Sequence, residues 1–467
     1  MVWKMIKKLS FYVKFGYGSA EGANSLMWTL FYLFYMYFLT DVAMINPSFA
    51  GLILMIGTVA DAILGLLIGR ISDGINTRWG RRRPILFAVA IPYGFAAWLL
   101  FTSFNMFASF SGYYFIGVVL IFFLCFSILD NTQGSLAAEI TNDYDERTSL
   151  VGFRTGWSQI FSIIAAGLPL IIVGMLKNYG YDQKTSWSIM AGIFGAISIP
   201  LILFTWRVTK GYELIPEINK ISFITALKDV YKNKSFWFTS GLYGFGWAGM
   251  NIASSSIIYI MKYYLGLNEN ESSLSFSILF MSSVFWIPII NYISKKFEKR
   301  YAFILFVSSW GVIQMLSIFI IQPGDKYLFY LFCFLISAGN TALLVLAWSM
   351  IPDLVEVDEF KTGQRKEGLY IGFSSTIMKI IVGLTLWTFG HAISLTGYIP
   401  NSVQSQKTLL GIRIIFGIGT MLFLFISVIF CYFLPLTRSR HIALKKAIDQ
   451  KKKGLDWDRN VLNGLYF

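Results

Sequence analysis

The amino-acid sequence predicts an all-α polytopic membrane protein, and three observations support that fold class. Hydrophobic residues make up 56% of the 467-residue chain, whereas charged residues make up only 14%. Long apolar stretches recur along most of the chain, and each can cross a hydrocarbon layer about 30 Å thick as a helix. A membrane-spanning barrel would instead show short alternating segments. We therefore expect the chain to cross a membrane many times as helices.

The apolar stretches predict about twelve spans. In chain order they cover residues 23–41, 48–71, 84–103, 112–137, 153–176, 186–206, 237–264, 272–294, 300–321, 327–352, 368–396 and 408–435. A polar stretch in the middle of the chain separates six spans from six, as expected for two similar halves. The predicted domains are an N-terminal half (1–206), a cytoplasmic linker (207–235), a C-terminal half (236–435) and a cytoplasmic tail (436–467).

The net charge of +14 reflects topology rather than nucleic-acid binding. Lysine and arginine residues cluster before the first span, after the second, in the central linker, after the eighth span and after the last. These loops all fall on one side of the predicted topology, and positive loops usually face the cytoplasm. The sequence therefore predicts a multi-pass protein of the cell (inner) membrane with both termini in the cytoplasm.

No catalytic or cofactor motif is visible in the chain. The sequence lacks a phosphate-binding P-loop and a Ser, His and Asp order typical of hydrolases. Cys125, Cys333 and Cys431 lie in apolar runs, with no spacing typical of metal ligands. We expect no enzyme activity and no cofactor, so an ion or solute gradient would have to supply the energy for transport.

Three ionisable residues interrupt apolar runs at the depth of the bilayer. Asp61 and Asp130 lie in the second and fourth predicted spans, and Lys379 lies in the eleventh. A charged group at that depth is costly and usually marks an ion or substrate pathway. The alternative is a permanent salt bridge that only holds helices together, although buried ion pairs stabilise poorly compared with apolar packing. The pattern favours a coupled transporter.

A set of short motifs resembles one transporter family. The motifs are SDGINTRWGRRRP over residues 72–84, Tyr17-Gly18 before the first span, Thr40-Asp41-Val42 at its end and Asp61-Ala62-Ile63 in the second span. Further matches lie in residues 143–154 and 353–379. Together they resemble the glycoside-pentoside-hexuronide:cation symporters of the major facilitator superfamily, relatives of the melibiose carrier. The resemblance implies twelve helices in two six-helix halves around a central cavity.

The resemblance also implies a cation-coupling site formed by Asp61, Ser127, Asp130 and Lys379. In the family, carboxylates on the second and fourth helices bind a cation, and a lysine on the eleventh helix approaches them from the other half. Buried carboxylates need a cation, a proton or the lysine ammonium to neutralise them. Release of the lysine by Na⁺ or H⁺ would shift the equilibrium between outward-open and inward-open states.

The predicted cation site departs from the melibiose-carrier pattern. Leu64 and Gly65 occupy positions where those carriers have an asparagine and a second aspartate. Sodium prefers several oxygen ligands, whereas a proton needs only one suitable carboxylate. H⁺ symport, a weak Na⁺ site and uncoupled facilitation therefore remain open, and the pattern favours H⁺.

Polar and aromatic residues recur at helical spacing in the predicted spans. Glu21, Asn24, Trp28, Tyr32 and Tyr35 share one face of the first span. The expected substrate-binding residues are Glu21, Asn24, Trp28, Tyr32, Asn131, Arg154, Trp247, Asn251 and Ser375. Aromatic rings can cover the apolar face of a sugar, and amides and charged groups can bind its hydroxyls. Ordinary packing remains the alternative for the rings, and an anchor at the membrane edge is the alternative for Arg154, which matches a sugar-contacting arginine of the family.

Two replacements bear on the substrate. Ser25 aligns with the main sugar-binding carboxylate of the melibiose carriers, and Gly134 aligns with a tryptophan. A roomier or differently charged ligand is implied, such as an oligosaccharide or a uronate-bearing glycoside. The expected function is import of a sugar or glycoside by symport with H⁺ or Na⁺. An uncoupled sugar facilitator and a carrier of amphipathic lipids are the alternatives.

Charged loops suggest a gate on the cytoplasmic side. The expected gate residues are Arg78, Arg81, Asp143, Glu356, Arg365 and Glu367, and an ordinary solvated loop is the alternative. Exposed pairs contribute about 0 to 1 kcal/mol each, which suits a gate that must open. The tail from Arg438 to Phe467 is expected to form a basic amphipathic or partly disordered segment at the membrane surface. By the resemblance, the protein is expected to be monomeric.

Overall fold

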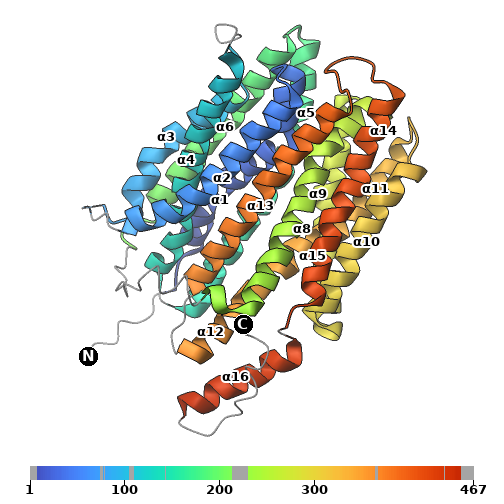
Figure 1. Ribbon diagram of the computed structural model, residues 1–467. Coiled ribbons are helices and arrows are strands. Elements are labelled where there is room, and N and C mark those ends of the chain that lie inside the picture. Colours follow the sequence, from blue (N-terminus) through green and yellow to red (C-terminus); the bar gives the residue numbers. More distant parts are fainter. Residues whose placement is uncertain are drawn as a thin grey trace. The chain divides into compact units, whose positions relative to one another are not determined.

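The described part of the protein consists of helices and connecting loops (Figure 1). A computed structural model describes residues 8–73, 77, 79–104, 110–141, 143–212, 230–362, 367–435 and 437–453. Within these ranges, the extended pairing is limited to an isolated bridge between Thr77 and Gly80. The predicted all-α class is confirmed.

The chain divides into two compact units. Unit 1 comprises Met1–Ile218, Leu267–Ser277 and Tyr398–Val403, and unit 2 comprises Asn219–Gly266, Ile278–Gly397 and Gln404–Phe467. Two short segments from the second half of the chain therefore belong to unit 1, which a simple division at the central linker does not capture.

Unit 1 is built on a series of long helices. They are α1 (Phe11–Leu30) with its π-helical continuations η1 (Phe31–Tyr35) and η2 (Phe38–Val42), α2 (Pro47–Asp73), α3 (Arg83–Leu100), α4 (Ser111–Ile140), α5 (Tyr144–Asn178) and α6 (Gln183–Val208). Side chains of Ser10, Asp143 and Asp182 accept hydrogen bonds from backbone N–H groups at the starts of α1, α5 and α6. These caps satisfy donors that would otherwise lack partners at a helix N-terminus.

Unit 2 contains the remaining described helices. They are α8 (Lys234–Tyr259) with η4 (Ile260–Leu265), α9 (Glu269–Phe297), α10 (Lys299–Ile320), α11 (Lys326–Ala342) with η5 (Leu343–Ala347) and α12 (Trp348–Thr362), α13 (Glu367–Leu395), α14 (Gln406–Ile414) with η6 (Ile415–Gly419) and α15 (Thr420–Tyr432), and α16 (Arg438–Lys452). The first turns of α9 are the exception, because Glu269–Ser277 belong to unit 1.

Helices occupy all twelve predicted spans, and ten of the helical stretches in the described ranges are long and apolar enough to cross a membrane. The two predicted spans outside this set are the first, in α1 and its continuations, and the seventh, in α8 and η4. Both contain glycine, tyrosine and polar residues, which lower their hydropathy. These two helices also carry most of the predicted substrate-binding residues.

Small residues set the close approach of helices within unit 1. A Cβ added at Gly94 on α3 would lie 2.6 Å from the carbonyl oxygen of Gly195 on α6. A Cβ at Gly18 on α1 would lie 2.9 Å from the carbonyl oxygen of Phe153 on α5. Larger residues would force these helices apart, and small residues commonly allow this kind of packing between membrane helices. The contact at Gly18 brings α1 next to the part of α5 that carries Arg154.

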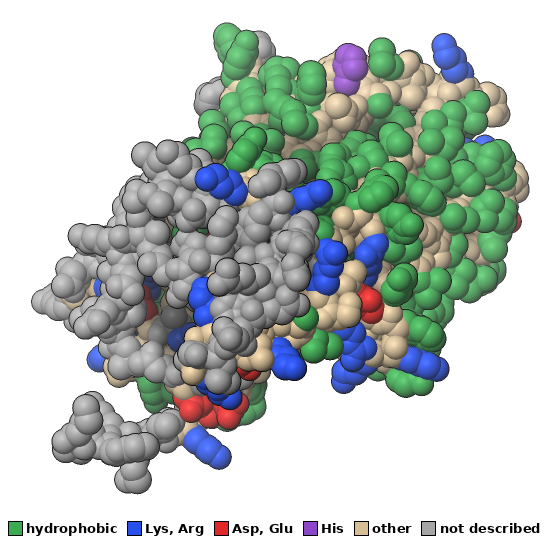
Figure 2. Space-filling model, turned by 60° about the horizontal axis from the view of Figure 1, so that its bottom comes forward, with side chains coloured by type: hydrophobic (Ala, Val, Ile, Leu, Met, Phe, Trp, Pro, Cys, Tyr) green, Lys and Arg blue, Asp and Glu red, His purple; other side chains and the backbone are tan. Residues whose placement is uncertain are grey.

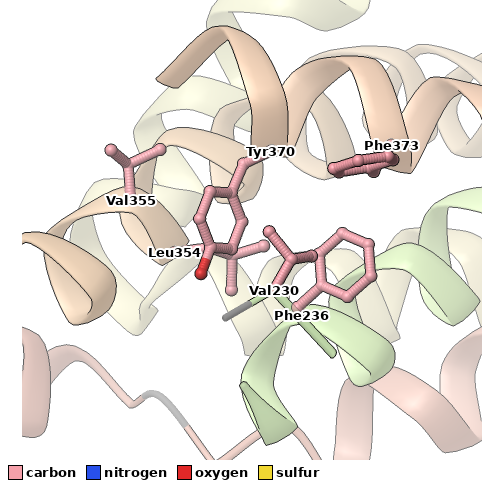
Figure 3. Packing of buried hydrophobic residues seen from close by; sticks show 6 residues of the cluster. All are labelled: Val230, Phe236, Leu354, Val355, Tyr370 and Phe373. Atoms are coloured by element: carbon pink, nitrogen blue, oxygen red, sulfur yellow. The ribbon is translucent and has the colours of Figure 1, made fainter. Parts of the chain in front are cut away.

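Unit 2 has a buried apolar cluster where α8, α12 and α13 meet (Figure 3). Its buried members are Val230, Phe236, Leu354, Val355, Tyr370 and Phe373. Further along α8 and α13 the Ser240 and Ser374 hydroxyls are 3.1 Å apart, and α13 passes close to Gly244. These contacts fix α13 against α8.

The tail forms a helix, α16, that packs on α12 within unit 2 (Figure 1). Leu444, Ala447 and Ile448 are buried, and the Lys451 ammonium donates to the Phe360 carbonyl oxygen at 2.8 Å. Lys and Arg side chains gather on the face of the molecule shown in Figure 2, whereas hydrophobic side chains cover its flank. The predicted basic amphipathic character is present, but the apolar side of α16 contacts protein. Residues 454–467 lie outside the described ranges.

Candidate functional site

Unit 1 holds a polar network centred on Arg154. The Arg154 Nε donates to Glu21 Oε2 at 2.6 Å, and its Nη2 donates to Asp130 Oδ1 at 3.3 Å. The Asn24 Nδ2 donates to the same Asp130 oxygen at 3.2 Å. We call these four residues the Arg154 network. It joins α1, α4 and α5, and one guanidinium is shared by two carboxylates.

The Arg154 network is partly accessible and contains two carboxyl groups for one guanidinium. The side chains of Glu21, Arg154 and Asp130 are 15%, 28% and 38% exposed, respectively. With both carboxylates ionised, two negative charges face one positive charge, which leaves the network at −1. Such a group at membrane depth is expensive unless it serves a ligand or an ion. It therefore marks the candidate site in this unit.

Gln133 supports the network from α4, and the sequence alone did not identify it. The Tyr17 hydroxyl donates to the Gln133 carbonyl oxygen at 3.2 Å, and the Gln133 Nε2 donates to the Tyr17 carbonyl oxygen at 3.3 Å. Gln133 is fully buried. A polar residue three positions after Asp130 in an apolar helix is the feature of the sequence that could have identified it. The reciprocal bonds hold α1 and α4 in the register that aligns Asn24 with Asp130.

Asp61 and Ser127 form a second polar group. Asp61 on α2 has 0% exposure, and the Ser127 hydroxyl on α4 donates to its Oδ1. The Asn131 Nδ2 donates to the Ser127 carbonyl oxygen at 2.8 Å. The structure thus brings together two of the predicted coupling residues, with a third predicted site residue one helical turn away. In the described ranges, no group of three or more His, Cys, Asp or Glu residues is placed to hold a metal ion.

Three glycines border these polar groups. A Cβ at Gly65 or Gly69 on α2 would lie 3.8 or 3.9 Å from the Asn131 amide. A Cβ at Gly134 on α4 would lie 3.6 Å from Arg154 Nη1. A larger side chain at any of these positions would have its Cβ beside the polar groups and would fill space next to them. Gly65 and Gly134 are two of the positions at which the sequence departs from the melibiose-carrier pattern, and both lie beside these polar groups.

The aromatic residues of the first span do not all share one face. The Trp28 ring lies 4.4 Å from Tyr32 and 5.3 Å from Phe126 on α4, measured between ring centroids. Tyr35, however, packs against Phe101 at the end of α3. The π-helical segment Phe31–Tyr35 adds residues to the turn. The expectation that Tyr35 continues the stripe was wrong for that reason.

Unit 2 carries the other predicted site residues. Trp247 and Asn251 lie on α8, and Ser375 and Lys379 lie on α13, which packs against α8. The Asn251 Nδ2 donates to the Trp247 carbonyl oxygen at 2.8 Å. Within the described residues, the buried Oδ1 atoms of Asn251 and of Asn24 accept no hydrogen bond. Each unit therefore offers a buried amide oxygen to a ligand or a water molecule.

The predicted gate residues are only partly described. Arg78, Arg365 and the side chain of Glu367 lie outside what the structure describes. Arg81 is buried, and Asp143 accepts from the Glu146 backbone N–H at 2.8 Å as the cap of α5.

Two ion-pair groups near these positions were not predicted. Arg82 pairs with Glu139 at 3.1 Å, and both side chains are nearly buried. Glu356 pairs with His441 at 2.7 Å and with Lys445 at 3.3 Å, so its partners come from α16.

Apolar spanning helices with charged groups among them define a polytopic membrane transporter. The chain belongs to the family described as MFS/sugar transport protein, whose model matches residues 16–438. This assignment confirms the predicted family, whose members are transporters rather than enzymes.

Curated relatives match nearly the whole chain. An uncharacterized symporter of Synechocystis sp. is 24% identical, with 96% of this chain and 98% of the relative covered. The glucuronide carrier protein homolog of Escherichia coli K12 is 25% identical over 96% of this chain and 98% of its own length. A putative sulfoquinovose importer of Salmonella typhimurium is 25% identical over 95% and 94%.

Solved structures confirm the fold. A bacterial homolog of the human lysosomal transporter Spinster, in an inward-facing and unoccupied conformation, superposes with a TM-score of 0.69. It is 14% identical, and the match covers 91% of this chain and 96% of that structure. At this identity the likeness concerns the fold alone.

Proposed function

We propose that this protein imports a sugar or glycoside by symport with H⁺ or Na⁺, through alternating access. The observation that carries the proposal is the Arg154 network, which places a guanidinium, two carboxylates and an amide among apolar spanning helices. The proposed location is the cell (inner) membrane, with both termini in the cytoplasm, and the proposed working unit is a monomer. The basic loops support this orientation.

The chemistry of the site supports a hydroxylated substrate. Amide and charged groups can bind sugar hydroxyls, and the Trp28 and Tyr32 rings beside them can cover an apolar sugar face. Two relatives are named for a glucuronide and for sulfoquinovose, and both of these sugars carry an acidic group. Together with Arg154 and the space beside Gly134, this favours a uronate-bearing glycoside or another acidic sugar.

Coupling is proposed to involve Asp61, Ser127, Asp130 and Lys379. Asp61 is fully buried and accepts a hydrogen bond from Ser127. A buried carboxylate needs a cation or a proton to neutralise its charge. Gly65 leaves this site without the second carboxylate of the melibiose carriers, which favours H⁺ over Na⁺ as the coupling ion.

Uptake by purified protein in liposomes tests the proposal. A panel of neutral sugars, uronates and glycosides would be offered with a Na⁺ gradient, with a pH gradient and with neither. Uphill accumulation of one sugar under one gradient is the expected result. Downhill flux alone would identify an uncoupled facilitator, and no flux of any sugar would reject the proposal.

A further inference from the structure

The two carboxylates that share Arg154 are not equivalent. Glu21 pairs with Nε at 2.6 Å, whereas Asp130 is 3.3 Å from Nη2. Asp130 also accepts from Asn24 and is 38% exposed, against 15% for Glu21. Loss of the guanidinium would leave Asp130 with the Asn24 amide and Glu21 with the Ser25 hydroxyl as donors, while Asp130 keeps the better access to water. Glu21 would become the costlier of the two to keep ionised, because it is more buried.

The Arg154 side chain is 28% exposed, and the Tyr17 hydroxyl is a further hydrogen-bond partner of it. Its Nε faces Glu21 and its Nη2 faces Asp130. Its Nη1 lies beside Gly134, which has no side chain to occupy the adjacent space. A carboxylate can bind a guanidinium through two parallel hydrogen bonds, which is the strongest arrangement available to it. A sugar carboxylate that enters beside Gly134 would compete with Glu21 for Arg154.

We propose that the carboxylate of an acidic sugar displaces Glu21 from Arg154, and that the released Glu21 takes up the proton that is carried with the sugar. This inference rests on the proposed function and names its substrate class and its proton acceptor. Glu21 then has a coupling role of its own, in addition to any role of Asp61.

The exchange balances in atoms and charge. No covalent bond of the sugar changes, and one O–H bond forms on Glu21 with a proton taken from water. Before binding, Glu21, Asp130 and Arg154 sum to −1. After binding, Asp130 and the sugar are negative, Arg154 is positive and Glu21 is neutral, so the sum is again −1. The site takes up a neutral pair, H⁺ and sugar anion, and needs no other ion.

The groups that surround Glu21 come from four helices. Arg154 approaches from α5 and Asp130 from α4, while Tyr17 lies one turn earlier on α1. Tyr93 on α3 lies close enough to interact with Glu21, and its hydroxyl donates to the Ala23 carbonyl oxygen at 3.3 Å. Arg154 is the cation among these neighbours, so its engagement by a ligand controls the charge of Glu21.

Proton counting during sugar binding tests the inference. Isothermal titration calorimetry of the full chain in buffers of different ionisation enthalpy would use methyl β-D-glucuronide and its neutral counterpart methyl β-D-glucoside. By linkage, we expect about one proton taken up per glucuronide, with affinity falling about tenfold per pH unit once Glu21 is ionised. Glu21→Gln should bind glucuronide with no proton uptake and with an affinity that no longer depends on pH.

Controls separate this inference from the proposed function. Glu146→Gln removes a carboxylate paired with Lys14 at 3.0 Å and should leave the proton count unchanged. Glu21→Asp should restore uptake, which guards against a folding defect. The inference is overturned if the wild type takes up no proton with glucuronide, if Glu21→Gln still does, or if only the glucoside binds. Absence of binding and flux for every sugar would instead reject the proposed function, and this inference with it.

Discussion

Asp61 is fully buried and accepts a hydrogen bond from the Ser127 hydroxyl, so substitution there can separate charge from shape. Asp61→Asn keeps an oxygen that can accept from Ser127 but removes the charge. We expect uphill sugar accumulation to fall at least a hundredfold while downhill exchange and folding persist, since Asn keeps the shape and the hydrogen-bond acceptor and removes the cost of burying a charge. Liposome uptake and size-exclusion profiles would check this.

A result against this prediction is uphill accumulation by Asp61→Asn at the wild-type level. That outcome would assign coupling to the Arg154 network alone. Ser127→Ala is a useful companion, because it removes the hydrogen bond to Asp61 and keeps the carboxylate.

Gly134 should govern the size of the substrate. Gly134→Trp would place an indole beside Arg154, because a Cβ added at this position would lie 3.6 Å from Nη1. We expect uptake of bulky glycosides to fall more than tenfold, with a smaller loss for monosaccharides. Gly117→Trp on the same helix is the matched control, because a Cβ there meets nothing within 4 Å. Equal losses for both variants would argue against a size filter at Gly134.

Single residues also show where sequence reasoning stops. Asp61, Asp130 and Lys379 stand out because a charge in an apolar run is visible in the sequence, whereas Glu21 and Arg154 were proposed from helical spacing and from the family resemblance. The pairing of Glu21 with Arg154 is not visible, because it depends on how α1 packs against α5. Gln133 was missed for the same reason, since its bonds to Tyr17 form only after α1 and α4 meet.

At the scale of helices, the boundaries were harder to predict than the spans. The fifth span was expected at residues 153–176, but α5 begins at Tyr144. Its first turns are hydrophilic, so hydropathy could not reveal them, although Asp143 supplies an ordinary helix cap. As a result Arg154 lies ten residues after the start of α5, beside Glu21.

The docking of α16 gives a prediction at this scale. Leu444 is fully buried, whereas Ile442 on the same helix is 59% exposed. Truncation of a buried leucine usually costs about 2 to 5 kcal/mol. Leu444→Ala should therefore raise amide hydrogen exchange in α16 at least tenfold, and Ile442→Ala should leave it nearly unchanged.

Hydrogen exchange by mass spectrometry would make this comparison in the full chain. A helix that rested with its apolar side on the membrane surface, as the sequence suggested, would respond to Ile442→Ala as strongly as to Leu444→Ala. That pattern would contradict the packing of α16 on α12.

For the whole molecule, the fold class and the family followed from hydropathy and from motifs in a consistent order. The division into units is less regular than six spans and six, because Leu267–Ser277 and Tyr398–Val403 belong to unit 1. The Tyr398 hydroxyl donates to Asp41 at 2.6 Å, and Lys177 pairs with Glu269 at 2.8 Å. Such long-range contacts have no signature in a single sequence.

Lys379 provides the test at the scale of the whole transporter, because it lies in unit 2 while Asp61 and Asp130 lie in unit 1. Lys379→Ala should abolish uphill accumulation but leave counterflow of labelled sugar, which needs no net ion movement. Lys407→Ala is the control, since this exposed lysine lies in the first turn of α14, at the start of the last span. Loss of counterflow along with accumulation would indicate a structural role for Lys379 instead.

The last described helix has a practical consequence for observing this protein at work. Because α16 packs on α12, with Leu444 buried and with contacts to Glu356 and Phe360, we expect the two helices to move together. A fluorescent dye placed on the solvent side of α16, for example at Lys446, would report the motion of α12 without touching the sugar pathway. The tail thus offers a labelling site for following the transport cycle by single-molecule fluorescence.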